Sequence, residues 1–225
     1  MIICIFDIDH TLYRASTVRS FLPYALRKGV LPFRFLLALP FYSILFFIRG
    51  VGSDLIGKEF RTMRGISQER MKAAARISYI RKIRPGLDPR ILEEIEKQRN
   101  TGSKILLASS SFYPVIEPLV TDIAPDAVIA TDIDFENGFS TGIIRVLPPF
   151  REGKKLRVLE YLKAMGTSPI SCMFFTDHHD DLPLLNIVGR PVAVNPTRRL
   201  RQIAAKRGWE IFDTQNNIHK RNHHD

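Results

Sequence analysis

The chain has 225 residues, of which 33 are Lys or Arg and 23 are Asp or Glu, so its formal net charge is +10. Apolar residues make up 45% of the chain and charged residues 25%, which is typical of a globular protein and excludes disordered, collagen-like and disulfide-scaffold chains. Cys4 and Cys172 each lie in an apolar run, which favours core packing in a reducing compartment. Because the N-terminus also lacks a basic leader, we expect a cytoplasmic protein.

Short apolar, partly β-branched runs recur along the chain and predict buried strands of a parallel sheet. They cover residues 2–6, 104–108, 127–130, 171–176 and 191–194. Segments with helical spacing lie between them at residues 90–100, 156–165 and 198–206. From residue 85 onward strand and helix therefore alternate, which predicts a doubly wound α/β core.

Residues 14–84 interrupt this alternation, because no β-run separates their helical stretches and several glycines and prolines punctuate them. We interpret them as an inserted α-helical cap, which leaves residues 1–13 and 85–225 as the core. The pair Asn137-Gly138 predicts a tight turn between residues 131–135 and 139–144. We interpret that segment as a small β-hairpin flap.

The basic surplus is concentrated in one part of the chain. Residues 14–90 hold 16 Lys and Arg and 4 Asp and Glu, a net charge of +12, whereas the remainder has a net charge of −2. A charge run of this kind is often only a solvated face. The functional alternative is a surface that meets a phosphorylated substrate, an acidic membrane or nucleic acid.

Acidic pairs follow the first and the fourth predicted strands of the core. The first strand ends in Asp7-Ile8-Asp9-His10-Thr11, where alternation puts Asp7 and Asp9 on the same side, and the fourth ends in Asp177-His178-His179-Asp180-Asp181. Neighbouring carboxylates repel each other, so they indicate a metal site or an acid/base couple, although Asp residues also cap turns. The two histidines suggest zinc as well, but a carboxylate-rich cluster without thiolates or further spaced ligands suits Mg²⁺ better.

Two segments between these acidic pairs suit an anion. The second strand runs into Ser109-Ser110-Ser111 before a predicted helix, where hydroxyls and free N–H groups favour negative charge, although Ser is also a common N-cap. Lys154 and Lys155 open the next helix and offer a cation to a phosphoryl group, although exposed lysines are common there. The order along the chain is therefore acid pair, hydroxyl, lysine and acid pair, near strand ends where parallel sheets bind ligands.

This order resembles the haloacid dehalogenase superfamily of phosphatases, and within it subfamily IB, the phosphoserine-phosphatase-like branch. The matching residues are Asp7-x-Asp9-x-Thr11, Ser109, Lys154 and Asp177-x-x-x-Asp181. The resemblance covers most of the chain and implies a Rossmann-like core whose cap corresponds to the helical insertion. It also implies a Mg²⁺-dependent phosphomonoester hydrolase.

The resemblance further implies a role for each matching residue. Asp7 would attack phosphorus and form an aspartyl-phosphate, while Asp9 would protonate the leaving oxygen and later activate water. Magnesium would be held by the carboxylate of Asp7, the backbone carbonyl of Asp9 and Asp177, with Asp181 in support. The phosphoryl oxygens would be bound by Thr11, Ser109, Ser110 and Lys154.

Several choices stay open at the level of sequence. Comparison with the branch favours Lys154 as the motif lysine, whereas the apolar spacing of the following helix suits Lys155. Hydrolysis and phosphoryl transfer to another acceptor would use the same residues. A non-catalytic membrane-docking module is the remaining alternative, and the complete set of motif residues argues against it.

The cap residues bear on the identity of the small phosphomonoester substrate. Phosphoserine phosphatases are expected to carry a glutamate nine residues after the nucleophile, where this chain has Ser16. Loss of such a charge-assisted contact costs about 1.5–3 kcal/mol, so we expect a substrate other than phosphoserine. His10 also departs from the superfamily, in which Gly is common at that position.

Residues 35–48 form an uncharged stretch of 14 residues between Arg34 and Arg49. As a helix it would span about 21 Å, which is shorter than the hydrocarbon core of about 30 Å. We expect it to be the buried centre of the cap. The alternative is an interfacial segment on an anionic membrane, because this stretch and residues 20–24 are similar to phosphatidylglycerophosphatase of the C type.

That alternative would make the substrate lipid-linked and the protein peripheral to the inner membrane. Nucleic acid is not an expected partner, since the basic segment lacks an obvious stacking platform or recognition motif.

Overall fold

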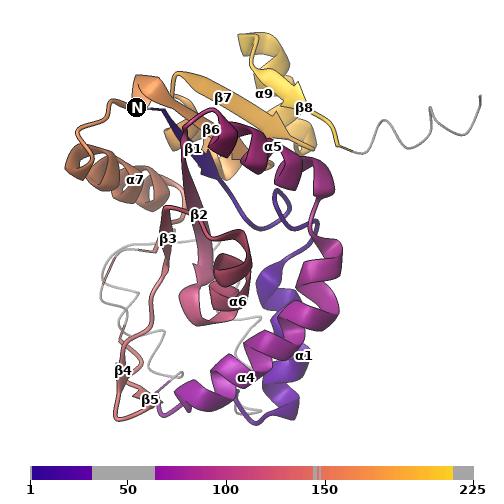
Figure 1. Cartoon of the computed structure of the whole chain (residues 1–225), viewed down its shortest axis with the longest axis vertical. Helices are drawn as coiled ribbons and strands as arrows, with labels where there is room; N and C mark the ends of the chain where they lie inside the picture. Colours follow the sequence, from indigo (N-terminus) through magenta and orange to yellow (C-terminus); the bar gives the residue numbers. More distant parts are fainter. Residues whose placement is uncertain (1, 32–63, 144–145, 147, 215–225) are drawn as a thin grey trace, which may run out of the picture.

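A computed structural model describes residues 2–31, 64–143, 146 and 148–214 (Figure 1). Within these residues the strands of the core form a six-stranded parallel sheet in the order β3-β2-β1-β6-β7-β8. The strands are β1 (Ile3–Phe6), β2 (Lys104–Phe112), β3 (Ala127–Thr131), β6 (Cys172–Thr176), β7 (Arg190–Val194) and β8 (Glu210–Phe212). The predicted α/β fold is confirmed, with β8 as a strand that the apolar runs did not reveal.

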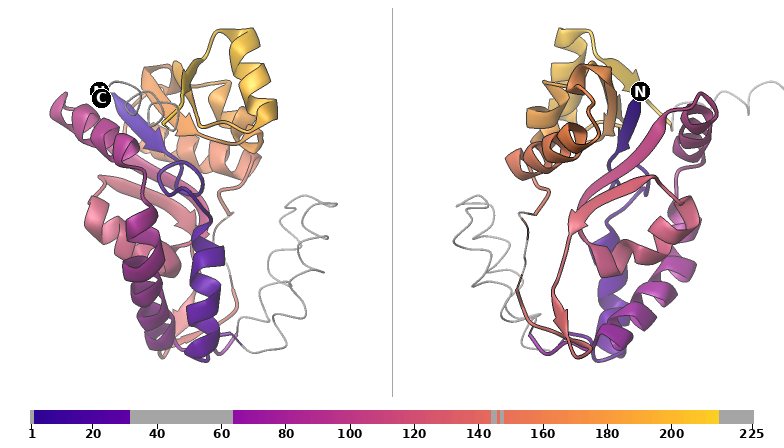
Figure 2. Two further views of the ribbon diagram at one scale, coloured as in Figure 1. Left: turned by 90° about the vertical axis from the view of Figure 1, so that its right-hand side faces the viewer. Right: turned by 60° about the vertical axis from the view of Figure 1, so that its left-hand side comes forward.

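Helices cover both faces of this sheet, as a doubly wound fold requires (Figure 2). One face packs against α5 (Pro89–Asn100) and α6 (Tyr113–Ile123), and the other against α7 (Glu152–Ala164), α8 (Leu182–Leu185) and α9 (Arg198–Arg207). The side chains of β1 alternate between the two faces of the sheet. Cys4 and Phe6 pack in the apolar cluster on the first face, and Ile3 and Ile5 pack in the cluster on the second face. The central strand is therefore buried on both sides, which explains its continuous apolar run.

A helical lobe lies beyond the carboxyl ends of β1 and β2 (Figure 1). It contains α1 (Thr17–Arg27) and α4 (Gln68–Ser78), whose N-caps are Ser16 and Ser67. α4 continues through one π-helical turn (Tyr79–Ile83) and a 3₁₀ turn (Arg84–Gly86) back to the core. The two helices pack on each other and on α6, through a separate apolar cluster that includes Phe21, Met71 and Val115.

The predicted hairpin is present as β4 (Phe135–Glu136) and β5 (Phe139–Ser140), with shorter arms than the sequence suggested. Its turn residues Asn137 and Gly138 have φ values of 50° and 80°, the positive values that a tight hairpin turn favours. The backbone N–H of Gln68 donates to the Gly138 carbonyl at 2.9 Å, and that of Ser140 donates to the Ile66 carbonyl at 2.9 Å. The hairpin is thus tied to the start of α4.

The described helices and the two cysteines bear on the predictions about membrane contact and core packing. Among the described helices, none has the length and apolar character needed to cross a membrane. Residues 35–48, which are predicted as a buried cap segment or an interfacial one, lie outside the described residues. Cys4 and Cys172 are both free and buried, as the sequence predicts.

Candidate active site

Three buried carboxylates lie together at the carboxyl ends of β1 and β6. These strands are neighbours in register, with Phe6 opposite Phe175, and the Asp7 amide donates to the Phe175 carbonyl at 3.0 Å. Asp7 therefore leaves β1 beside Asp177, the first residue after β6, and the short turn that follows returns Asp181 to the same place. The exposed fractions of Asp7, Asp177 and Asp181 are 7%, 8% and 5%.

Lys154 joins this group from the first turn of α7. Its Nζ lies 2.8 Å from Asp7 Oδ1 and 2.8 Å from Asp181 Oδ2. The Thr176 hydroxyl also donates to Asp181 Oδ2, at 2.6 Å. Lys155 instead pairs with Glu152 at 2.6 Å on the outer side of α7. The sequence left the choice between Lys154 and Lys155 open. In the structure Lys154 lies in the site and Lys155 lies outside it.

Burial and neighbouring charges shift the pKa values of these groups. Burial raises the pKa of Asp7, Lys154 opposes the rise, and Asp181 and Asp177 add to it. Burial likewise raises the pKa of Asp177 to about 6, against the opposing effect of His178. Burial would lower the pKa of Lys154, but the carboxylates of Asp181 and Asp7 outweigh it and hold that pKa above its ordinary value.

The donor set fits a divalent cation of the Mg²⁺ type. Among the described residues the cluster contains three buried carboxylates and one buried ammonium group. Its donors are oxygens, which Mg²⁺ prefers, and burial raises the pKa of Asp7 and that of Asp177, so a cation would favour their charged forms. The residues at these two strand ends therefore suit the metal that the resemblance implies.

Asp9 is oriented toward the helical lobe. Its Oδ2 accepts a hydrogen bond from Ser111 Oγ at 2.7 Å, and its Oδ1 accepts one from the backbone N–H of Thr17, the first residue of α1. The hydroxyls of Thr17 and Ser111 are 2.7 Å apart. A helix N-terminus favours a carboxylate, so α1 and β2 together position Asp9. The sequence prediction did not include Thr17 or Ser111.

The serine run lies within β2 and not at the start of a helix. β2 continues to Phe112, with an irregular register after Ala108, and α6 begins only at Tyr113. Ser109 and Ser111 are buried, and the Ser111 amide donates to Ser109 Oγ at 3.1 Å, whereas Ser110 is exposed. The structure therefore does not bring the Ser110 side chain to the other predicted residues. Strand alternation was the sequence signal that could have pointed to Ser111.

The loop after β1 supplies Thr11 and His10. Thr11 is fully buried, and its hydroxyl donates to Asp177 Oδ1 at 3.4 Å, so it lies against a carboxylate of the site. His10 is exposed and has a φ of 61°, the left-handed conformation that glycine adopts most readily. This conformation explains why Gly would be common at a position where this chain has His.

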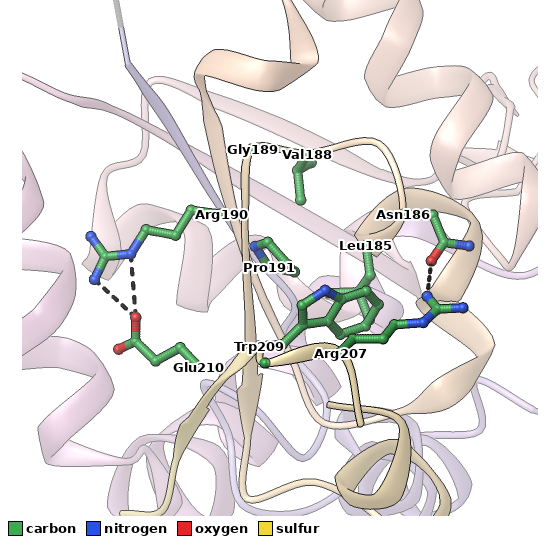
Figure 3. Close-up of a pocket in the computed structure, with 10 residues that line it drawn as sticks. Leu185, Asn186, Val188, Gly189, Arg190, Pro191, Arg207, Trp209 and Glu210 are labelled. Atoms are coloured by element: carbon green, nitrogen blue, oxygen red, sulfur yellow. Dashed lines mark hydrogen bonds and ion pairs between the residues drawn. The ribbon is translucent and has the colours of Figure 1, made fainter. Parts of the chain in front are cut away.

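A pocket of about 650 Å³ lies away from these residues (Figure 3). It is formed where the chain enters β7 and β8, whereas Asp7 and Asp177 stand where β1 and β6 end. Arg207 stacks over the Trp209 ring at 4.9 Å, and Arg190 pairs with Glu210 at 2.9 Å. The pocket contains none of the sequence-predicted site residues. It is lined by Leu185, Asn186, Val188, Gly189, Arg190, Pro191, Arg207, Gly208, Trp209 and Glu210.

Comparisons with known proteins agree with the fold. A histidinol-phosphatase of Neisseria meningitidis is 26% identical over 217 residues, which cover 94% of this chain and 98% of that protein. A solved protein of unknown function from Bordetella pertussis has a TM-score of 0.81 and 27% identity, over 95% of this chain and 98% of that one. A phosphoserine phosphatase solved in its apo form shares the fold, with a TM-score of 0.65 and 17% identity over 97% of this chain and 96% of that one.

The family assignment rests on a match to a family model that covers more than half of the chain. The model of the haloacid dehalogenase-like hydrolase family matches residues 4–186. This range contains both acidic pairs, the serine run and Lys154, so it includes the residues on which the resemblance in the sequence was based. The chain belongs to the haloacid dehalogenase-like hydrolase family.

Proposed function

We propose that this enzyme hydrolyses a small phosphomonoester through an aspartyl-phosphate formed on Asp7. Its family and its relatives named as phosphatases place it among the phosphoric monoester hydrolases. The observation that carries the proposal is the buried Asp7 carboxylate, held 2.8 Å from Lys154 at the strand end that it shares with Asp177. A nucleophile beside a fixed cation is the arrangement that phosphoryl transfer needs.

In the first step an oxygen of Asp7 forms a bond to phosphorus while the ester oxygen leaves. Lys154 binds Asp7 through Oδ1, which leaves Oδ2 for the attack. The ammonium group of Lys154 and the hydroxyl of Ser109 stabilise the charge on the phosphoryl oxygens. Thr11 and Ser110 complete the proposed phosphate-binding set. The Thr11 hydroxyl lies in the site beside Asp177, and Ser110 would contact the phosphate through its backbone.

Asp9 is the proposed general acid and base. It donates a proton to the departing alkoxide and then takes one from the water that hydrolyses the aspartyl-phosphate. Its contacts with Ser111 and with the first amide of α1 tie this proton transfer to the helical lobe. We therefore assign residues 14–84 to a cap that positions Asp9 and excludes bulk water.

Mg²⁺ is the proposed cofactor. It would be held by Asp7, the Asp9 carbonyl and Asp177, with support from Asp181. When bound, it shields the phosphoryl group from the negative charge of the approaching carboxylate. The raised pKa of Asp177 and that of Asp7 support this assignment, because burial disfavours their charged forms and a bound cation would favour them.

The proposed substrate is a small phosphomonoester other than phosphoserine. Ser16 accepts a hydrogen bond from the Arg19 amide as the N-cap of α1, so this position offers a helix cap and no carboxylate for a substrate ammonium group. The lipid-linked alternative depends on residues 35–48, which lie outside the described residues. A screen of sugar phosphates, amino-alcohol phosphates, phosphoamino acids and lysophospholipids would distinguish these classes.

The isosteric replacement Asp7→Asn tests the nucleophile. We expect hydrolysis of p-nitrophenyl phosphate in saturating Mg²⁺ to fall by at least about 10³-fold, because removal of a nucleophile abolishes the covalent route. Asp132→Asn is the matched control, since Asp132 is an exposed carboxylate after β3. Circular dichroism would establish that both variants are folded. Appreciable turnover by folded Asp7→Asn would contradict the assignment.

A further inference from the structure

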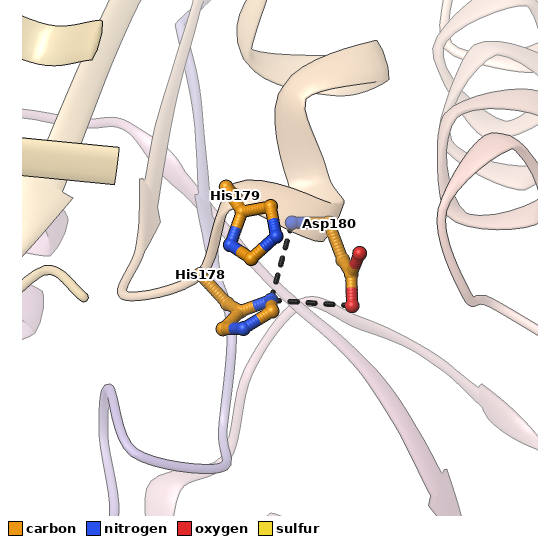
Figure 4. A group of neighbouring side chains, drawn as sticks. All are labelled: His178, His179 and Asp180. Atoms are coloured by element: carbon orange, nitrogen blue, oxygen red, sulfur yellow. Dashed lines mark hydrogen bonds and ion pairs between the residues drawn. The ribbon is translucent and has the colours of Figure 1, made fainter. Parts of the chain in front are cut away.

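We propose that His178, His179 and Asp180 form a second metal site, for a transition-metal ion of the Zn²⁺ class. The three residues lie in the turn that follows β6, which includes the 3₁₀ segment His179–Asp181. One ring nitrogen from each histidine and one oxygen of Asp180 all lie within 4.8 Å of one another (Figure 4). This donor set differs from the oxygen donors of Asp7 and Asp177, because imidazole suits Zn²⁺ and not Mg²⁺.

The spacing of these atoms is close to that of a metal centre. Bonds of about 2.0–2.2 Å to Zn²⁺ place neighbouring tetrahedral ligands about 3.3–3.6 Å apart. His178 Nδ1 and Asp180 Oδ2 are 3.2 Å apart, so two of the three ligand atoms are already close to this separation. The ring centroids of His178 and His179 are 4.2 Å apart, which keeps the third ligand beside the other two.

His179 has a nitrogen without a partner. Its Nδ1 is buried and makes no hydrogen bond with the part of the chain that the structure describes. A buried polar atom left unsatisfied costs about 1–3 kcal/mol. Coordination of the ion by Nδ1 itself would remove this penalty.

Neighbouring groups orient the other two ligands. The Arg151 Nε donates to Asp180 Oδ1 at 2.9 Å, which leaves Oδ2 directed toward His178. The Asp180 amide donates to His178 Nδ1 at 3.2 Å, so this nitrogen presents a lone pair on the side of the cluster. The ion would replace that hydrogen bond, while Arg151 would hold the carboxylate as an outer-shell partner.

The position of the turn allows an ion to enter. The side chain of His178 is 40% exposed and that of Asp180 is 22% exposed. Three protein ligands leave one tetrahedral position open to water or to another ligand. The site would therefore bind metal reversibly at the surface, beside the buried carboxylates of the proposed catalytic centre.

A titration with Co²⁺ and Zn²⁺ tests the proposal. The chain has six histidines, of which His219, His223 and His224 lie outside the described residues, so the parent protein should be the full chain with these three replaced by Ala. Saturating Mg²⁺ would fill the carboxylate site. We expect one equivalent of Co²⁺ to give the visible absorption of a tetrahedral site with nitrogen ligands, and Zn²⁺ to displace it.

Variants of the parent identify the ligands. We expect His178→Ala and His179→Ala each to weaken Zn²⁺ binding by more than about tenfold, because even outer-shell changes cost about 10–100-fold in affinity. His10→Ala is the control, since His10 is an exposed histidine outside the turn. His178→Gln provides a second test if the alanine variant does not fold. The proposal is overturned if the parent binds no Zn²⁺, or if folded variants of His178 and His179 bind it as tightly as the parent.

Discussion

Lys154 is the only described cation that contacts both Asp7 and Asp181, at 2.8 Å in each case, and just 4% of its surface is exposed. Burial of an unpaired charge carries a penalty of several kcal/mol. The ammonium group of Lys154 therefore depends on the two carboxylates for its charged state. Lys155, one residue along the helix, pairs with Glu152 and lies outside this group.

The two lysines give a matched pair of variants. We expect Lys154→Met to lower the kcat for p-nitrophenyl phosphate by about 10²–10³-fold, as the loss of one group that stabilises transition-state charge does. Lys155→Met should leave kcat and KM unchanged, because the Lys155 ammonium group pairs with Glu152 on the outer side of α7. Steady-state kinetics in saturating Mg²⁺ would measure both. Equal losses in the two folded variants would remove Lys154 from its proposed role.

Ser110 and Ser111 are neighbours in β2, but one is exposed and the other is buried. Ser111 donates to the Asp9 carboxylate at 2.7 Å, while Ser110 is exposed. A hydrogen bond to a charged group contributes about 1.5–3 kcal/mol, so we expect Ser111→Ala to lower kcat by about 10–100-fold. Ser110→Ala should have a smaller effect, since the proposed contact of Ser110 with phosphate is through its backbone. A larger loss in Ser110→Ala would contradict the role given to Ser111.

Among the secondary-structure elements, the sequence best predicts the strands that are buried on both faces. The run at residues 2–6 predicts β1 because both faces of that strand are covered. The end of β2 was predicted too early, since Ser109–Ser111 carry the strand beyond the apolar core into the site. β8 was missed because it is a short edge strand whose residues are only partly buried. The sequence predicted that Asp7, Asp177 and Asp181 come together, whereas the contact between Thr17 and Ser111 depends on packing of the helical lobe against β2.

The two connections between the lobe and the core run side by side. The Arg14 amide donates to the Gly86 carbonyl at 3.1 Å, and the Asp88 amide donates to the Leu12 carbonyl at 2.9 Å. The fully buried Asp88 carboxylate accepts from Arg14 Nε at 2.9 Å, from the Arg90 amide at 3.0 Å and from Thr214 Oγ1 at 2.5 Å. Asp88 therefore fastens both connections to the last described residue of the core.

Replacement of Asp88 should destabilise the protein in a pH-dependent way. Burial would raise the pKa of Asp88, but its hydrogen bonds to Arg14, Thr214 and Arg90 hold that pKa below its usual value. The resulting stability is present above about pH 4 and is lost as the pH falls through the lowered pKa. We expect Asp88→Asn to lower the Tm at pH 7, and the difference from wild type to narrow below about pH 4. Asp132→Asn serves as the exposed control, and a difference independent of pH would contradict this role.

Across the whole molecule, part of the basic surplus holds the lobe against the core. Lys72 of α4 pairs with Glu117 at 3.2 Å, and Arg84 pairs with Asp122 at 3.6 Å, both acids being on α6. Arg14 pairs with Asp88 at 2.9 Å. The more exposed of these pairs contribute little individually and are weakened by salt. These pairs nevertheless show that some of the positive side chains in residues 14–90 have acidic partners within the chain, so this part of the charge does not require an external anion.

We expect the carboxylates at the carboxyl ends of β1 and β6 to make the stability of the protein depend on the proposed Mg²⁺. The pKa of Asp7 and that of Asp177, about 6, are raised above the unfolded value of about 4, first by burial. Their contribution to stability is therefore complete below about pH 4 and is lost as the pH rises through the folded pKa values. The proposed Mg²⁺ would bind the deprotonated carboxylates of the folded protein and not those of the unfolded chain, so we expect it to oppose this loss.

We expect the increase in Tm caused by Mg²⁺ to be larger at pH 7.5 than at pH 5, where the carboxyl groups of the site are more protonated. At a concentration 100 times the Kd, the ion would stabilise the folded state by about 2.7 kcal/mol. Thermal unfolding with and without Mg²⁺ at the two pH values measures the effect, and Asp177→Asn should show a smaller increase than wild type. An increase that is the same at both pH values, or the same in Asp177→Asn, would show that these carboxylates do not hold the ion.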